Sequence, residues 1–317
     1  MVNSDLQSKI LQEHRPDASI LTAKRQSVLR ELQNGLKASV VSYIANVGNP
    51  VASMMPADID SVMDLIKVAA QENTDNKNDA VVYLILESPG GDGNTAEKLI
   101  GMFRSVFTKG FYVIIPNLAK SAATMLSLGA DKIIMGLSSE LGPIDPQVQI
   151  LLPSGQPYYT PAKSILGTID KARDEISKNE KMANLYYPLL QQIRPEYLKY
   201  CEDALSFSEE FAKRWLPVGS MNGRTQTEIK NTVKELISGS RFNMHGSVIS
   251  YNDARDVLRL NVDVWDNGSN LWSLVWEYYL RAKAFFQVNP GSAKLFESTK
   301  TSVNMAAQII PLQQQKQ

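Results

Sequence analysis

Two short stretches of the sequence hold residue types that could hydrolyse an acyl bond. In "VVYLILESPGGDGNTAEKLI", Gly90 and Gly91 stand between an apolar run and helix-forming residues. In "NLAKSAATMLSLGADKI", Ser121 stands at the start of a helix of small residues. Ser121 could attack a carbonyl carbon, while the N–H groups of Gly91 and Ala122 would stabilise the oxyanion. Glycine at position 91 would permit a close approach that a side chain would block.

Each stretch also has an ordinary structural explanation. Glycine pairs are common in turns, and a serine at the start of a helix commonly caps it. Parallel strands, however, bring their C-terminal ends to one edge of a sheet, and ligands bind in the crevice outside that edge. We therefore expect the Gly90–Gly91 loop to lie beside Ser121.

The elements that would position these residues alternate between strand and helix from residue 38 to residue 136. The near-continuous apolar run of "AVVYLILES" is typical of a parallel strand covered on both faces. "ASVVSYIANV", "FYVIIP" and "DKIIMG" are also predicted to be strands, with helical stretches between them. The pattern predicts an α/β fold with a mainly parallel sheet and right-handed crossovers.

Composition excludes several classes of function. The 33 basic residues balance 33 acidic residues, so no overall field attracts nucleic acid. The chain has only two histidines and one cysteine, Cys201, which predicts no metal site, no cofactor and no internal disulfide. No run is apolar for long enough to span a bilayer, and the N-terminus lacks a secretory pattern. These features predict a cytoplasmic protein without membrane insertion.

Three motifs in order resemble those of the Clp-fold serine peptidases: "ESPGGDG", "KSAATMLSLGADKIIM" and "LGPIDPQV". Within that group the chain is similar to the serine dehydrogenase proteinase branch, which is related to signal peptide peptidase A. The resemblance covers roughly residues 20 to 265. It implies a Clp/crotonase-like spiral of ββα units, hydrolysis of peptide bonds in a peptide or protein substrate, and assembly into a homo-oligomer. It also implies that Ser121 is the nucleophile and Gly91 the oxyanion glycine.

The catalytic base is the point at which this chain departs from the family. Clp peptidases have a histidine shortly after the serine, where this chain has "IDPQVQ". The relatives of signal peptide peptidase A use a lysine further downstream, which here corresponds to Lys171 or Lys163. We rank Lys171 first. Lys120 is interpreted as a solvated charge, and Asp145 either forms a turn or orients the base. The stretch 245–262 resembles a family element that we interpret as structural.

The sequence divides into four parts. Residues 1–36 are predicted to form a helical N-terminal arm, 37–265 the peptidase domain, 266–310 a C-terminal helical segment, and 311–317 a disordered tail. The leading hypothesis is a serine peptidase with a Ser–Lys dyad. Two alternatives remain open, namely an inactive Clp-fold scaffold and a crotonase-like enzyme that acts on acyl-coenzyme A thioesters.

Overall fold

The structure is a computed structural model of the chain. It describes residues 6, 9–10, 18–72, 80–151, 154–191, 193–239, 241–266 and 268–306. The predicted tail, 311–317, lies outside the described residues, as does most of the first half of the predicted N-terminal arm.

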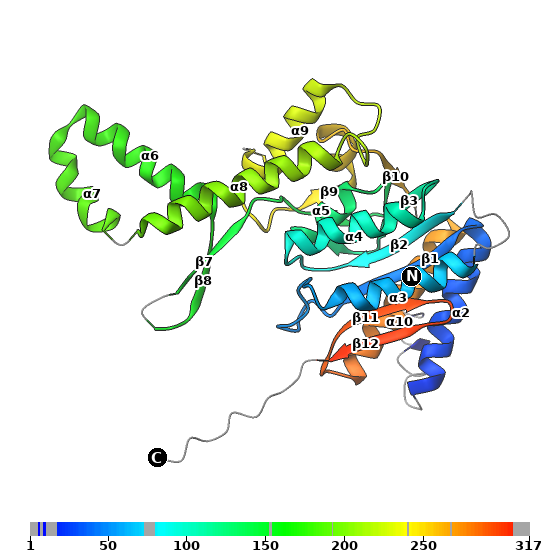
Figure 1. Cartoon of the computed structure of the whole chain (residues 1–317). Coiled ribbons are helices and arrows are strands. Elements are labelled where there is room, and N and C mark those ends of the chain that lie inside the picture. The colour runs from blue at the N-terminus through cyan, green and yellow to red at the C-terminus, as the bar shows by residue number, and fades with distance from the viewer. Residues whose placement is uncertain are drawn as a thin grey trace, which may run out of the picture.

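A mainly parallel sheet forms the centre of the molecule (Figure 1). Among the described residues its strand order is β10-β5-β3-β2-β1-β11-β12. The first five strands in this order run parallel, and β11 and β12 join antiparallel at one edge. The bounds are β1 Ser39–Ala45, β2 Val81–Glu87, β3 Gly110–Ile115, β5 Lys132–Met135, β10 Val262–Val264, β11 Ser292–Ser298 and β12 Ser302–Ala306. The predicted α/β fold with a mainly parallel sheet is confirmed.

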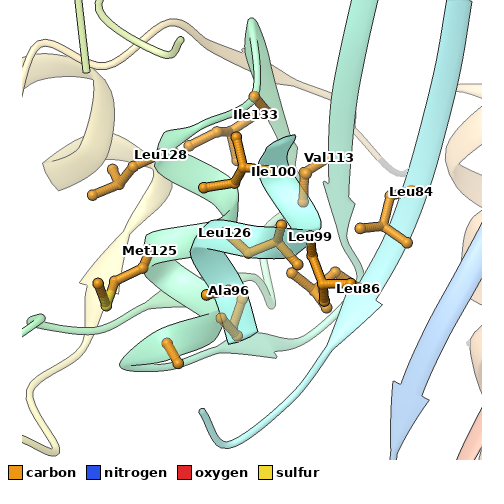
Figure 2. Close-up of a cluster of buried hydrophobic side chains, with 14 of the residues drawn as sticks. Leu84, Leu86, Ala96, Leu99, Ile100, Val113, Met125, Leu126, Leu128 and Ile133 are labelled. Carbon is orange, nitrogen blue, oxygen red and sulfur yellow. The ribbon is translucent and has the colours of Figure 1, made fainter. Parts of the chain in front are cut away.

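Helices cover both faces of this sheet, as the apolar strands require. On one face lie α3 (Asp58–Glu72), α4 (Gly93–Val106) and α5 (Ala122–Leu128), packed in a large buried cluster. On the other face α2 (Ala18–Leu36) and α10 (Asn270–Val288) bury a second cluster. Figure 2 shows how side chains of α4 and α5 meet those of the strands. This packing fixes the start of α5, where Ser121 lies.

A small second sheet sits beside the C-terminal ends of the central strands. It consists of β4 (Leu118–Ala119), β6 (Glu140–Leu141) and β9 (Ile249–Ser250). Strand β6 pairs parallel with β4 and antiparallel with β9. The segment before β9 is thereby brought next to the segment before Ser121.

A hairpin and two helices extend away from the sheet (Figure 1). The hairpin pairs β7 (Gln147–Leu151) with β8 (Pro157–Pro161), and α6 (Ala162–Lys178) and α7 (Ala183–Leu190) follow. We call the described residues from 147 to 190 the extension. The long helix α8 (Pro195–Trp215) then returns to the body, where it contacts α9 (Gln226–Ser238) and α5.

The C-terminal part differs from the sequence-based prediction. Residues 266–310 were expected to be helical, but after α10 the chain forms β11 and β12. Strand β11 is buried along its whole length because it pairs with β1 on one side and β12 on the other. In the described part of the chain, every helix is too short or too polar to cross a membrane.

Candidate active site

Ser121 occupies a sharp turn between β4 and α5. Its backbone angles are φ 50° and ψ −117°, a conformation that costs non-glycine residues free energy. Although Ser121 is the N-cap residue of α5, its side chain makes no capping hydrogen bond. The capping explanation is therefore wrong, and the hydroxyl is available for another role. A strained turn from strand to helix is also how hydrolases of another fold expose a nucleophilic serine.

The glycine loop lies against this turn, but its two glycines serve different contacts. A Cβ atom on Gly90 would stand 2.6 Å from the Cβ of Ser121, so Gly90 allows the close approach to the serine. A Cβ on Gly91 would stand 2.2 Å from the carbonyl oxygen of Met54. Both glycines have positive φ, 101° and 143°. The sequence-based prediction that the two loops meet is confirmed, but it named Gly91 for the approach that Gly90 makes.

The backbone pairing of the loop sets the direction of the Gly91 N–H. Met54 donates its N–H to the Gly90 carbonyl at 2.7 Å and accepts the Asp92 N–H at 2.9 Å. Because these two bonds form a parallel bridge between Met54 and Gly91, the N–H group of Gly91 itself points away from Met54. At the other loop, Ala122 is the first residue of α5, where backbone N–H groups have no partner within the helix.

A histidine and an aspartate that line the same cavity as Ser121 form a hydrogen-bonded pair. His245 Nδ1 lies 2.9 Å from Asp145 Oδ1, and the Asp145 side chain is 1% exposed. The other carboxylate oxygen, Oδ2, accepts a hydrogen bond from the Gln147 amide at 3.1 Å. If Nδ1 carries the proton that Asp145 accepts, Nε2 is unprotonated and can take a proton from another group.

Local structure holds this pair in place. His245 lies in the segment between α9 and β9, and β9 pairs with β6. The Lys120 ammonium donates to the carbonyl of Ser247 at 3.1 Å and forms an ion pair with Glu140 at 3.0 Å. Lys120 was interpreted as a solvated charge, but its side chain is only 15% exposed because it anchors this loop.

Ser121, Gly90, Gly91, Asp145 and His245 all line one cavity of about 820 Å³. The Tyr159 side chain of the hairpin and several side chains of α8 complete its wall. The other lining residues are Ser53, Pro89, Asp92, Gly93, Asn94, Met125, Ile144, Pro146, Gln147, Tyr200, Asp203, Ala204, Phe207 and Ser208. No Lys or Arg is among these described lining residues.

Asp92 contributes a fixed negative charge to the cavity wall. Burial raises the pKa of this carboxyl, but hydrogen bonds from Thr95 and Asn94 outweigh that effect and lower the pKa below its ordinary value. Asp92 accepts the backbone N–H of Thr95 at 2.7 Å and thus caps α4. The Asp92 carboxylate thus stabilises the N-terminus of α4 through its negative charge and its hydrogen bond.

The structure does not bring the two predicted lysines to this cavity. Lys171 lies on α6 in the extension, where its side chain is 69% exposed and 3.9 Å from Glu175 of the same helix. Lys163 lies in the first turn of α6, outside the cavity lining. Helix α6 extends away from the body of the molecule (Figure 1), so both lysines lie in the extension and outside the described lining of the cavity.

His245 is the site residue that sequence reasoning missed. It comes far after Ser121 in the chain, and only the pairing of β9 with β6 brings it close. Asp145 stands where the family's histidine was sought, and its role as an orienting group was one of two interpretations. The one available signal was the rarity of histidine in this chain. In the described residues, no group of three or more His, Cys, Asp or Glu side chains could hold a metal ion.

Comparison with known proteins agrees with the motifs around this site. The model of the family described as ClpP-like SDH-type serine proteinase matches residues 10–214. The chain belongs to this family.

Curated relatives match about half of the chain. It is 30% identical over 167 residues to the uncharacterized protein MJ0137 of Methanocaldococcus jannaschii, a region that covers 49% of this chain and 52% of that protein. It is 27% identical over 161 residues to the uncharacterized protein MJ1495 of the same organism, covering 49% of each. The chain thus spans about half the length of the curated relatives it matches.

Two solved structures are also similar. One is a mutant of the 1510-N membrane-bound stomatin-specific protease, with 15% identity, a TM-score of 0.40, and coverage of 67% of this chain and 75% of that one. The other is a mutant of ClpP1 from Listeria monocytogenes, with 14% identity, a TM-score of 0.38, and coverage of 76% of this chain and 99% of that one.

Proposed function

We propose that the protein is a serine peptidase in which Ser121 is the nucleophile, His245 the general base and Asp145 the group that orients it. The observation that carries this proposal is the shared cavity, which has a strained serine turn, a glycine loop and a histidine–aspartate pair in its wall. The histidine replaces the lysine of the Ser–Lys hypothesis, because Lys171 and Lys163 lie in the extension.

The reaction would proceed by acyl transfer. His245 Nε2 accepts the Ser121 proton as Oγ bonds to the carbonyl carbon of the peptide, and the carbonyl oxygen becomes an anion. The N–H groups of Gly91 and Ala122 donate to that oxyanion. The imidazolium, stabilised by Asp145, then gives its proton to the leaving amine, and water hydrolyses the acyl-enzyme by the same steps in reverse order.

The two alternative functions receive less support. A scaffold without activity rested on a missing base, and His245 supplies a candidate for it. An acyl-coenzyme A enzyme would need cations for the cofactor's phosphates, and none of the described lining residues is a Lys or Arg. Under that hypothesis Ser121 has no catalytic role, so the backbone strain at Ser121 would have no functional explanation.

Labelling with a fluorophosphonate tests the proposal. The parent protein should form a covalent adduct on Ser121, located by peptide mass spectrometry, and should cleave an unstructured protein such as casein. His245→Ala should lose both reactions, whereas Lys171→Ala should keep them. Absence of an adduct on the parent protein across pH 6 to 10 would contradict the peptidase proposal.

Assembly into a homo-oligomer remains part of the proposal. Helix α7 exposes three large apolar side chains, Leu185, Tyr187 and Leu189, which are 61%, 64% and 52% exposed. Such side chains on a projecting element are costly in a monomer. Light scattering of the purified chain should give a mass of at least two copies, and Leu185→Lys should lower it.

A further inference from the structure

A buried ion pair joins β11 to the start of α3, outside the described lining of the cavity. Lys294 Nζ of β11 is 2.6 Å from Asp58 Oδ1 at the start of α3, and the two side chains are 1% and 0% exposed. Removing two charges from water is costly unless further hydrogen bonds satisfy them. Such a pair adds little to stability compared with apolar side chains, so its other contacts indicate what it does.

The second oxygen of Asp58 accepts two more hydrogen bonds. The Tyr43 hydroxyl donates to Oδ2 at 2.6 Å, and the Met55 N–H donates to the same oxygen at 2.9 Å. Burial and the neighbouring Asp58 raise the pKa of Tyr43 well above its ordinary value, so the hydroxyl remains a donor. Asp58 therefore fixes the position of the Tyr43 side chain of β1 and of the backbone at Met55, just before α3.

The Met55 branch reaches one side of the glycine loop. Met55 follows Met54, whose N–H and carbonyl bind Gly90 and Asp92 on either side of Gly91. Fixing Met55 to the buried carboxylate therefore fixes the strand-like segment against which the loop is paired.

The Tyr43 branch reaches the other side of the same loop. The Ser88 hydroxyl accepts the Gly90 N–H at 3.2 Å, and its interaction with the Tyr43 hydroxyl offsets part of the rise in the pKa of Tyr43. The backbone of Ser88 also bridges to Ala119, two residues before Ser121. The two branches thus hold the loop from both sides and connect it to the serine turn.

We infer that Lys294, Asp58, Tyr43 and Ser88 form a positioning network that fixes the direction of the Gly91 N–H. We call these four residues the loop-anchoring network. Its catalytic consequence rests on the proposed function, since the Gly91 N–H is a proposed oxyanion donor. An oxyanion donor is effective when its direction is fixed before the reaction, because no reorganisation is then needed. Loosening the loop therefore slows turnover and affects substrate binding little.

The opposite face of the same two strands supplies a matched control. There Glu297 of β11 binds Arg25 of α2 at 2.8 Å, and its carboxylate also accepts the Tyr278 hydroxyl at 2.8 Å. Tyr278 is 0% exposed, like Tyr43, and its hydroxyl contacts Ser42 of β1. This cluster joins β1, β11, α2 and α10, so it stabilises the sheet on the face opposite α3.

The experiment compares Tyr43→Phe with Tyr278→Phe in the full chain. Hydrogen–deuterium exchange of the segment 88–93 should be at least about tenfold faster in Tyr43→Phe and unchanged in Tyr278→Phe. The kcat for casein-derived peptides should fall about tenfold in Tyr43→Phe with KM within about twofold, the pattern of a weakened oxyanion donor. Tyr278→Phe should keep kcat within about twofold, even where its melting temperature falls equally.

A second pair of variants guards against a folding defect at Tyr43. Ser88→Ala removes the acceptor of the Gly90 N–H, and Ser42→Ala removes the comparable hydroxyl on the opposite face. Equal exchange of segment 88–93 in both members of each pair would overturn the inference. If the parent protein neither hydrolyses peptides nor forms a fluorophosphonate adduct, the proposed function fails, and the exchange measurements still decide whether the network fixes the loop.

Discussion

Replacing Asp145 by asparagine should reverse the hydrogen bonding of His245. The Gln147 amide donates to Oδ2 of Asp145 at 3.1 Å, so the carbonyl oxygen of an asparagine would take that place. Its NH₂ group would then face Nδ1 of His245, which now sits 2.9 Å from Oδ1. Nδ1 would have to accept, the proton would move to Nε2, and the ring could no longer take the Ser121 proton.

The expected loss in kcat/KM is about 10⁴-fold, the cost of holding a catalytic histidine in the wrong tautomer, which corresponds to about 5 kcal/mol in the barrier. Adding Gln147→Glu should turn the amide of the asparagine at 145 by half a rotation. The carboxylate at 147 would accept a hydrogen bond from the asparagine NH₂, and the asparagine oxygen would then accept the Nδ1–H of His245. We expect the double variant to recover at least about tenfold of the lost rate.

The assay is initial-rate hydrolysis of a quenched fluorescent peptide library, with the labelling rate at Ser121 as a second readout. Asp203→Asn is the matched control, since it removes a carboxylate of the same cavity that pairs with Lys199 at 2.7 Å and not with His245. It should stay within about threefold of the parent. An Asp145→Asn enzyme that keeps more than a tenth of the parent rate, with an unchanged melting temperature, would refute the proposed role.

Three further outcomes are expected. Ser121→Ala should abolish labelling and cleavage. Because glycine tolerates φ 50°, urea denaturation should show a free energy of unfolding about 1 kcal/mol higher for Ser121→Gly than for Ser121→Ala. Gly91→Val should lower kcat at least about a hundredfold, since any side chain there displaces Met54 from the loop; a rate within about threefold of the parent would contradict this. Lys171→Ala should leave the rate against pH unchanged, whereas His245→Ala should remove activity at every pH; a loss confined to Lys171→Ala would restore the lysine hypothesis.

The sequence alone predicts the part of the site that depends on neighbouring strands. Strands β2 and β3 are apolar and parallel, so their ends meet and bring Gly90 next to Ser121. Local signals also located the start of α5 and the glycine turn. These predictions succeed because each depends on short segments with a single periodicity.

The remainder depends on pairings between distant segments. His245 reaches the cavity only through the two-residue contact of β9 with β6, which no periodicity reveals. Strands β11 and β12 follow a long helix, and the sequence-based prediction overlooked the turn signal of Asn289, Pro290 and Gly291 that separates α10 from β11. Lys171 was predicted to be the base, but it lies outside the cavity because the residues that follow Asp145 form an extension that leads away from the body.

The extension is inserted in the sequence between Asp145 and His245, so changes in the extension are separated from changes in this hydrogen-bonded pair. Asp145 lies just before β7, and His245 lies well after α8, so the whole excursion from 147 to 215 falls between two halves of one hydrogen-bonded pair. Substitutions or insertions in the hairpin and α6 alter the mouth of the cavity through Tyr159 while the pair stays anchored to the body by β6 and β9. Under the proposed function, a lineage of such proteins can therefore change which peptide substrates it admits without rebuilding the residues proposed to react with them.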